Sequence, residues 1–283
     1  MIIDMHTHLF PTTIRENREN FFLDEPAFAL LYRDPGARMV GADEMVRAMD
    51  ENGVDVSVVF GFPWMNPDTC RRHNDYILES VSRHPDRFVG FCCVNPYTRE
   101  AEKEVQRSLD NGLSGVGELA LYQEGGITED AVQRIEPIMA QCRQKNLPVL
   151  FHTNEPVGHM YPGKSDNTLA QIYNLVRTYG ENTIILAHWG GGLFFYNLLK
   201  KEVSDVLANV YFDTAATPFL YDPQIYRVAM ELAGEEKILF GTDYPLIPPS
   251  RYYKEIEAAG ISAAAREKLL GANAARVLSI PHE

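Results

Sequence analysis

The sequence predicts an α/β fold, a single-domain (β/α)8 barrel or TIM barrel that covers residues 1–283 and carries a long loop after its first strand. Three observations lead to this prediction. Eight short apolar runs occur along the chain, a helical pattern separates nearly all of them, and polar side chains end many of them. Strands that alternate with helices imply right-handed βαβ units and a parallel sheet, and eight such units are typical of a barrel. A doubly wound sheet would use fewer strands and gather its chemistry at one switch point.

The first strand is expected within residues 1–10, where Ile2 and Ile3 precede a His-x-His pair. Residues 9–41 follow it without a clean hydrophobic period and are expected to form a long loop with short helices, a length that is usually functional. The later strands are expected at 54–60, 88–94, 115–119, 148–151, 183–187, 210–212 and 238–240.

The helices are placed by their capping and turn residues. Asp43 is a typical N-cap, Asn52-Gly53 is a typical helix end, and Pro67 stands at a permitted first position. The expected helices are 44–51, 66–84, 98–111, 128–145, 167–179, a helix from the three glycines at 190–192 to about 206, then 223–233, 250–259, 262–270 and 272–278. No linker divides the chain, which favours one domain.

Composition excludes several classes of protein. The formal net charge is −13, so a basic surface for nucleic acid or anionic membrane is not expected. The four cysteines form no C-x-x-C pair and are expected to be buried, reduced thiols. We find no signal-peptide pattern and no apolar run long enough to span a bilayer, so a cytoplasmic protein is expected.

The chemistry-bearing residues stand at the ends of different predicted strands. His6 and His8 lie two apart on the first strand and therefore point to the same side. His152, His188 and Asp243 each end a strand of their own, and in a barrel all these ends meet at one face. Imidazoles and a carboxylate in this arrangement predict a metal site, with Zn²⁺ first and Mn²⁺, Fe²⁺, Co²⁺ or Ni²⁺ as alternatives.

These motifs resemble the amidohydrolase superfamily: Asp-x-His-x-His on the first strand, single histidines on the fifth and sixth, and Gly-Thr-Asp-Tyr-Pro on the eighth. The last block and the closing Gly-Ala-Asn-Ala-Ala-Arg-Val-Leu resemble its amidohydrolase-2 branch, which contains aminocarboxymuconate semialdehyde decarboxylase-like enzymes and a lactonase. The resemblance implies that His6, His8, His152 and Asp243 bind a metal. It also implies that Asp243 is the catalytic base and that His188 is a catalytic residue beside the metal or a ligand of a second one.

Glu118, on the fourth strand, is expected to touch the metal or its surroundings, because a carboxylate buried beside histidines without a cation is costly. Its position resembles that of the bridging carboxylate in binuclear members of the superfamily. Direct ligation, with one or two metals per chain, and a hydrogen bond to the histidines both stay open.

Substrate contacts are expected from His159, Tyr161 and Lys164 in the loop after the fifth strand, and from Trp189 after the sixth. Each of these residues could instead pack within its own loop. Asp4 is expected to orient a histidine, and Asp213 to support neighbouring loops.

The leading prediction for function is a metal-dependent hydrolase that activates water to cleave a small lactone, ester or amide. The alternative is a metal-dependent decarboxylase or hydratase that acts on an aromatic or muconate-like acid. Glu118 favours hydrolysis, because the resemblance implies that the decarboxylases of the family bind one metal and do not use this carboxylate. The expected partner is a small molecule, a homodimer is left open, and a TatD-like nuclease is disfavoured by the acidic sequence.

Overall fold

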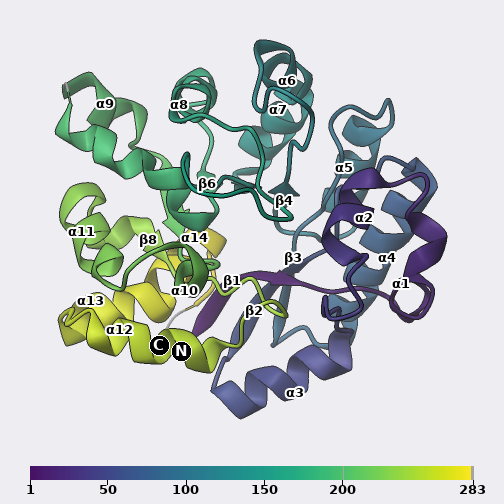
Figure 1. Cartoon of the computed structure of the whole chain (residues 1–283), viewed down its shortest axis with the longest axis horizontal. Helices are drawn as coiled ribbons and strands as arrows, with labels where there is room; N and C mark the ends of the chain where they lie inside the picture. The colour runs from purple at the N-terminus through teal and green to yellow at the C-terminus, as the bar shows by residue number, and fades with distance from the viewer. Residues whose placement is uncertain (200, 282–283) are drawn as a thin grey trace.

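Eight parallel strands surround a common centre, with helices outside them, in the computed structural model, which describes residues 1–199 and 201–281 (Figure 1). Hydrogen bonding orders the strands as β1-β2-β3 and as β4-β5-β6-β7-β8. The strands are β1 Ile3–His8, β2 Val56–Phe60, β3 Phe88–Gly90, β4 Val116–Leu119, β5 Val149–Phe151, β6 Ile184–Leu186, β7 Val210–Asp213 and β8 Ile238–Leu239. Each coincides with a predicted strand to within two residues at either end, except that β3 ends four residues before the predicted end, so the predicted barrel is confirmed.

The barrel closes where the two strand groups meet. Beside β1 and β8, Met5 N–H donates to the Phe240 carbonyl and Asp243 N–H donates to the His6 carbonyl, both at 2.8 Å. Beside β3 and β4, Cys92 N–H donates to the Gly115 carbonyl at 2.9 Å. The closure brings the carboxyl ends of all eight strands to one face.

Side chains alternate between the barrel interior and the layer beneath the helices. Val58 and Phe60 belong to the interior apolar cluster, whereas Val59 between them packs into the larger cluster under the helices. Leu150 and Phe151 divide in the same way on β5. Both faces of these strands are therefore buried, which explains why the strands read as continuous apolar runs rather than alternating ones.

The helices follow the predicted order, with shorter pieces. The α-helices are α1 Thr12–Arg15, α2 Pro26–Tyr32, α3 Ala42–Asn52, α4 Pro67–Arg83, α5 Ala101–Asp110, α6 Glu129–Arg134, α7 Glu136–Lys145, α8 Leu169–Thr178, α9 Lys201–Val206, α10 Thr217–Leu220, α11 Gln224–Ala233, α12 Pro249–Ala258, α13 Ala263–Glu267 and α14 Asn273–Leu278. The 3-10 segments are η1 Arg18–Phe21, η2 His188–Leu198 and η3 Glu235–Lys237, and η4 Lys268–Ala272 is a π-helix.

One predicted helix, 128–145, is two helices. α6 ends at Arg134 and α7 begins with Pro137 in its first turn, where proline lacks the N–H that a continuous helix would use. The helix expected after the three glycines is also divided, into η2 and α9.

The long loop after β1 carries α1, η1 and α2, as predicted, and lies beside α4 at one edge of the barrel (Figure 1). Phe28 on α2 packs 4.7 Å from Trp64, measured between ring centroids, and Phe10 packs 5.1 Å from His73 on α4. The buried Glu25 carboxylate accepts the backbone N–H groups of Met65 and Asn66, both at 2.8 Å. This loop therefore forms a fixed wall beside the strand ends.

All four cysteines are buried and unpaired, as predicted. Across the described ranges, no helix has the length and apolar character needed to cross a bilayer.

Candidate metal centre and cavity

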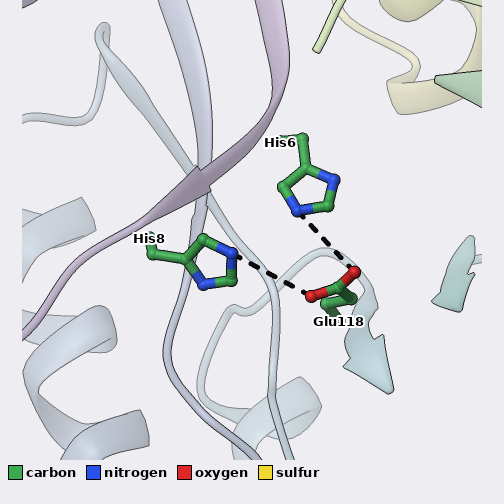
Figure 2. A group of neighbouring side chains, drawn as sticks. All are labelled: His6, His8 and Glu118. Carbon is green, nitrogen blue, oxygen red and sulfur yellow. Dashed lines mark ion pairs between the residues drawn. The ribbon is translucent and has the colours of Figure 1, made fainter. Parts of the chain in front are cut away.

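The predicted site residues converge at the carboxyl ends of the strands. His6 and His8 project from β1 toward Glu118, which stands on β4 (Figure 2). His152 follows β5, His188 follows β6, and Asp243 lies four residues beyond β8. Apart from the partly exposed His8 and Asp243, these residues are buried.

Each of the four histidines has one ring nitrogen next to a protein acceptor. His6 Nδ1 lies 2.8 Å from Asp213 Oδ2, and His152 Nε2 lies 2.8 Å from the Gly163 carbonyl. His188 Nδ1 lies 3.0 Å from the Ala215 carbonyl, and His8 Nδ1 lies 3.3 Å from the Gly61 carbonyl. Carbonyl and carboxylate oxygens only accept, so a neutral imidazole whose other nitrogen faces a cation carries its proton on these nitrogens.

The other nitrogen of each ring therefore turns a lone pair toward the two carboxylates. Glu118 Oε1 lies 2.8 Å from His152 Nδ1, 3.6 Å from His188 Nε2 and 3.8 Å from His6 Nε2. His8 Nε2 lies 3.2 Å from Asp243 Oδ1 and 3.9 Å from Glu118 Oε2. Lone pairs that face carboxylate oxygens repel one another unless positive charge lies among them.

These donors fit a divalent cation. Three groups of three residues have ligand atoms that all lie within 4.8 Å of one another: His6 with His8 and Glu118, His6 with His188 and Asp243, and Glu118 with His152 and His188. The buried His6 Nε2 has no hydrogen-bond partner among the described residues and points at Glu118. Imidazole nitrogen and carboxylate oxygen are donors that Zn²⁺ and Mn²⁺ both accept.

The electrostatics of the site favour positive charge. Burial opposes the charged form of His6, but Asp213, Glu118 and Asp243 outweigh it and raise the pKa of His6 to about 10. Burial alone would raise the pKa of Glu118, yet His152 and His6 hold that pKa well below its ordinary value. Burial alone would raise the pKa of Asp243 too, but its contact with the His8 ring and the nearby His6 and His188 outweigh burial and lower that pKa.

Two further aspartates position the site. Asp213 accepts from His6 Nδ1 and from the backbone N–H groups of His188 and Ala215. The same carboxylate therefore orients the His6 ring and holds the backbone at the start of the turn that carries His188. Asp4 accepts from the Thr242 N–H and hydroxyl and from the His6 N–H, which joins β1 to the segment after β8. The ring-orienting role expected of Asp4 thus belongs to Asp213.

The turn that carries His188 has an unusual backbone. His188, Trp189 and the glycines at 190–192 all have positive φ, between 54° and 93°. Left-handed conformations cost little only at glycine, which accounts for the run of three. A Cβ at Gly191 would lie 2.4 Å from the Asn154 carbonyl oxygen, so the turn packs directly against the segment after β5.

A cavity of about 970 Å³ opens above the strand ends and reaches His8, Glu118, His152, His188 and Asp243. Its other lining groups come mainly from the loop after β1 and the loops after β5, β7 and β8. The position agrees with the general rule that barrel active sites lie at the carboxyl ends of the strands.

The predicted substrate residues divide into two pairs. His159 and Tyr161 line the cavity. Lys164 donates to Glu155 Oε1 at 2.7 Å and to the Val157 carbonyl at 2.6 Å, which uses its charge inside the loop. Trp189 is fully buried and its indole N–H donates to Thr217 Oγ1 at 2.9 Å. Neither Lys164 nor Trp189 is among the described residues that line the cavity.

Several lining residues have no counterpart in the predictions. Tyr32 and Arg38 come from the loop after β1, Phe62 follows β2, and Tyr122 follows β4. Tyr122 and Phe62 follow strand ends, so their positions could have been predicted. Tyr32 and Arg38 lie in a segment without a period, and the sequence carries no signal for them.

Comparison with known proteins gives a family and a set of relatives. The family model described as amidohydrolase matches residues 3–280. A 2-amino-3-carboxymuconate-6-semialdehyde decarboxylase of Dictyostelium discoideum is 23% identical, over 98% of this chain and 91% of the relative.

Two solved structures share the fold over nearly the whole chain. A 5-carboxyvanillate decarboxylase from Sphingomonas paucimobilis has a TM-score of 0.78, at 18% identity, and 99% of each chain is covered. A dihydroxybenzoic acid decarboxylase from Polaromonas sp. JS666, with bound manganese and the inhibitor 2-nitroresorcinol, has a TM-score of 0.72 at 20% identity, covering 100% of this chain and 98% of the other.

These findings correct the predicted reaction. Hydrolysis of a lactone, ester or amide was wrong, because the similar proteins are named as decarboxylases, which break a carbon–carbon bond. The error came from Glu118, whose presence was taken to separate hydrolases from decarboxylases. The preference for zinc also lacks support, since a neighbour holds manganese.

Proposed function

The chain is an enzyme that belongs to the amidohydrolase family, and from this premise we propose that it is a metal-dependent decarboxylase of a small aromatic or muconate-like carboxylic acid. The observation that carries the proposal is the similarity to a decarboxylase along 98% of the chain. The histidine and carboxylate cluster under a cavity supports it, because such an enzyme needs a charged site that a small acid can reach.

We assign His6, His8, Glu118, His152 and Asp243 as metal ligands, with His188 beside them. Two of the three ligand groups share only Glu118, so these donors could hold two cations, and His188 would then be a ligand of the second one. We place manganese before zinc, since a neighbour of the same fold holds manganese. A divalent cation bound among these residues would attract the negatively charged oxygens of the substrate.

In the proposed reaction the bond between the carboxylate carbon and the ring breaks, carbon dioxide leaves, and the ring carbon gains a proton. We assign Asp243 to carry this proton, because its carboxylate lines the cavity and its Oδ1 lies 3.2 Å from His8 Nε2. His188 keeps its Nδ1 on the Ala215 carbonyl, so its Nε2 is the atom that can meet a substrate oxygen.

The cavity wall supplies the remaining contacts in this proposal. Arg38 is the only arginine or lysine among the described lining residues, and its guanidinium carbon lies 5.8 Å from the centre of the Tyr244 ring. We assign it to attract the anionic substrate. Tyr32, Tyr122, His159 and Tyr161 are assigned as polar groups that orient the ring. Four buried, unpaired thiols suit a reducing compartment such as the cytoplasm.

The proposal predicts that the manganese-loaded enzyme releases carbon dioxide from one or more members of a panel of hydroxybenzoates, carboxyvanillate and aminocarboxymuconate semialdehyde. Carbon dioxide release and loss of substrate absorbance are to be measured together. Chelation and the double variant His6→Ala/His8→Ala should each reduce turnover by at least a thousandfold. Turnover that persists in the double variant, or a product that has gained water without losing carbon dioxide, would refute the proposal.

A further inference from the structure

The mouth of the cavity has an apolar rim, which we define as Leu30, Val157, Phe219 and Leu246. Their side chains are 58%, 73%, 59% and 56% exposed, and all four line the cavity. They come from α2, the loop after β5, α10 and the loop after β8. Four separate segments thus place a large apolar side chain at the same opening.

This clustering sets the rim apart from the rest of the surface. Among the described residues eleven large apolar side chains are exposed, and four of them belong to this one opening. Exposed apolar side chains that gather at one place mark a binding surface, whereas scattered ones need no explanation.

The size of the cavity also indicates a ligand that extends from the metal centre to the rim. A volume of about 970 Å³ lies near the upper end of the range for drug-sized ligands, about 300–1,000 Å³, and far exceeds what one substituted ring needs. The buried lining groups include Glu118 and His188 of the metal centre, whereas the four rim side chains are exposed, as are the lining residues Asp34, Arg38 and His159. This arrangement fits a ligand with a charged head and an apolar tail.

We propose that the substrate is an elongated acid whose alkyl or aryl tail lies against the apolar rim while its carboxylate lies at the metal centre. The assignment of the carboxylate end rests on the proposed function, whereas the tail rests on the rim and the volume. Tail burial would remove apolar surface of both ligand and rim from water, which is worth about fourfold in affinity for each buried methylene.

The test is equilibrium binding of unreactive analogues to the manganese-loaded enzyme by calorimetry. The probes are 2-nitroresorcinol and a series that carries ethyl, butyl and hexyl chains on the ring carbon opposite the nitro group. We expect affinity to rise about fourfold per methylene that reaches the rim. The double variant Phe219→Ser/Leu246→Ser should abolish this rise and leave the affinity for the unsubstituted probe within twofold.

The matched control is Leu23→Ser/Leu198→Ser, which removes two exposed leucines that are not among the described lining residues and should keep the full chain-length dependence. Equal affinity along the series in the unmodified enzyme would overturn the inference. So would a rim variant that changes a dimer into a monomer by light scattering while the series stays unchanged, because the rim would then be a subunit contact.

The two proposals fail in different ways. If neither the acids on the panel nor their alkyl homologues lose carbon dioxide but the chain-length dependence appears, decarboxylation is refuted and the apolar tail site stands. If short hydroxybenzoates are decarboxylated and their alkyl homologues gain neither affinity nor kcat/KM, decarboxylation stands and the tail site is refuted.

Discussion

Each histidine at the cavity floor uses one ring nitrogen for a protein acceptor and turns the other toward Glu118 or Asp243. The backbone acceptors Gly163, Ala215 and Gly61, with Asp213, thereby select the tautomer of each ring. His152 presents Nδ1, whereas the other three present Nε2. Loss of a hydrogen-bond partner of this kind typically lowers metal affinity by about 10- to 100-fold.

Glu118 is the residue whose removal should report how many cations bind. We expect two manganese ions per unmodified chain and one in Glu118→Gln, because this carboxylate is shared by two ligand groups and glutamine carries no charge. Elemental analysis after gel filtration, with a calorimetric titration of Mn²⁺, measures both stoichiometry and affinity.

Asp34→Asn is the matched control for Glu118→Gln, because Asp34 also lines the cavity but lies outside the ligand groups of the described chain. It should bind as much manganese as the unmodified protein. One ion per chain in both the unmodified protein and Glu118→Gln would contradict the two-cation assignment.

The sequence could predict the convergence of these residues but not every role. Strand-end position was enough to bring together His6, His152 and Asp243. It could not show that Trp189 turns back into the protein, since that follows from its positive φ and its bond to Thr217. Nor could it show that Lys164 is held by Glu155, a contact within a loop that has no regular period.

At the scale of elements, the left-handed turn at 188–192 holds the segment after β6 against the segment after β5. Asn154 Oδ1 accepts from the N–H and the hydroxyl of Ser165, which closes the base of the loop between them. Gly191 packs against the Asn154 carbonyl, and Gly163 in the same loop accepts from His152. The turn, the loop and one proposed ligand therefore form a continuous contact.

Gly191→Ala should destabilise the protein by about 3 kcal/mol, the sum of about 1 kcal/mol for a left-handed alanine and about 2 kcal/mol for overlap with a backbone carbonyl. Urea unfolding measures this loss. Gly53→Ala is the control, because Gly53 has a similar φ of 68° but no heavy atom within 4 Å of its added Cβ. It should lose only about 1 kcal/mol. An equal loss of unfolding free energy in the two variants would show that the contact with Asn154 does not contribute to the destabilisation.

Element type was predictable and element length was not. The eight strands are short apolar runs buried on both faces, and helices separate them along the chain. This pattern is typical of a parallel sheet covered by helices and fits few other folds. The helix at 128–145 and the helix from the glycines at 190–192 to about 206 were predicted as single helices. The break at Pro137 and the left-handed turn depend on local geometry that a periodic pattern does not carry.

At the scale of the whole molecule, His73 connects the wall of the cavity to the barrel. Its Nε2–H donates to the Leu9 carbonyl at 2.6 Å, and its Nδ1 accepts from the Trp64 indole N–H at 2.9 Å. Only the neutral ring satisfies both bonds, because a protonated Nδ1 would face another donor. Burial outweighs the hydrogen bond to the Leu9 carbonyl and lowers the pKa of His73 from 6.5 to about 4.

The unfolded chain therefore takes up a proton at His73 between pH 6.5 and 4, and the folded protein does not. Stability from this residue is complete above pH 6.5 and falls as the pH drops toward 4, by about 3 kcal/mol in total. Urea unfolding of the unmodified protein and of His73→Gln, at pH 7 and pH 4, isolates this effect because all other titrating groups are shared. A stability difference that does not change between the two pH values would contradict it.

The barrel consists of two arcs, β1–β3 and β4–β8, which meet at two seams. His6 and His8 belong to the first arc, whereas Glu118, His152 and His188 belong to the second. A cation held by both sets would act as a further cross-link between arcs that backbone hydrogen bonds, the Asp4–Thr242 bonds and the interior apolar side chains already join, much as a disulfide joins two distant segments. Cation binding and closure of the barrel would then be thermodynamically coupled, so that the free energy of cation binding also opposes separation of the two arcs at the seams.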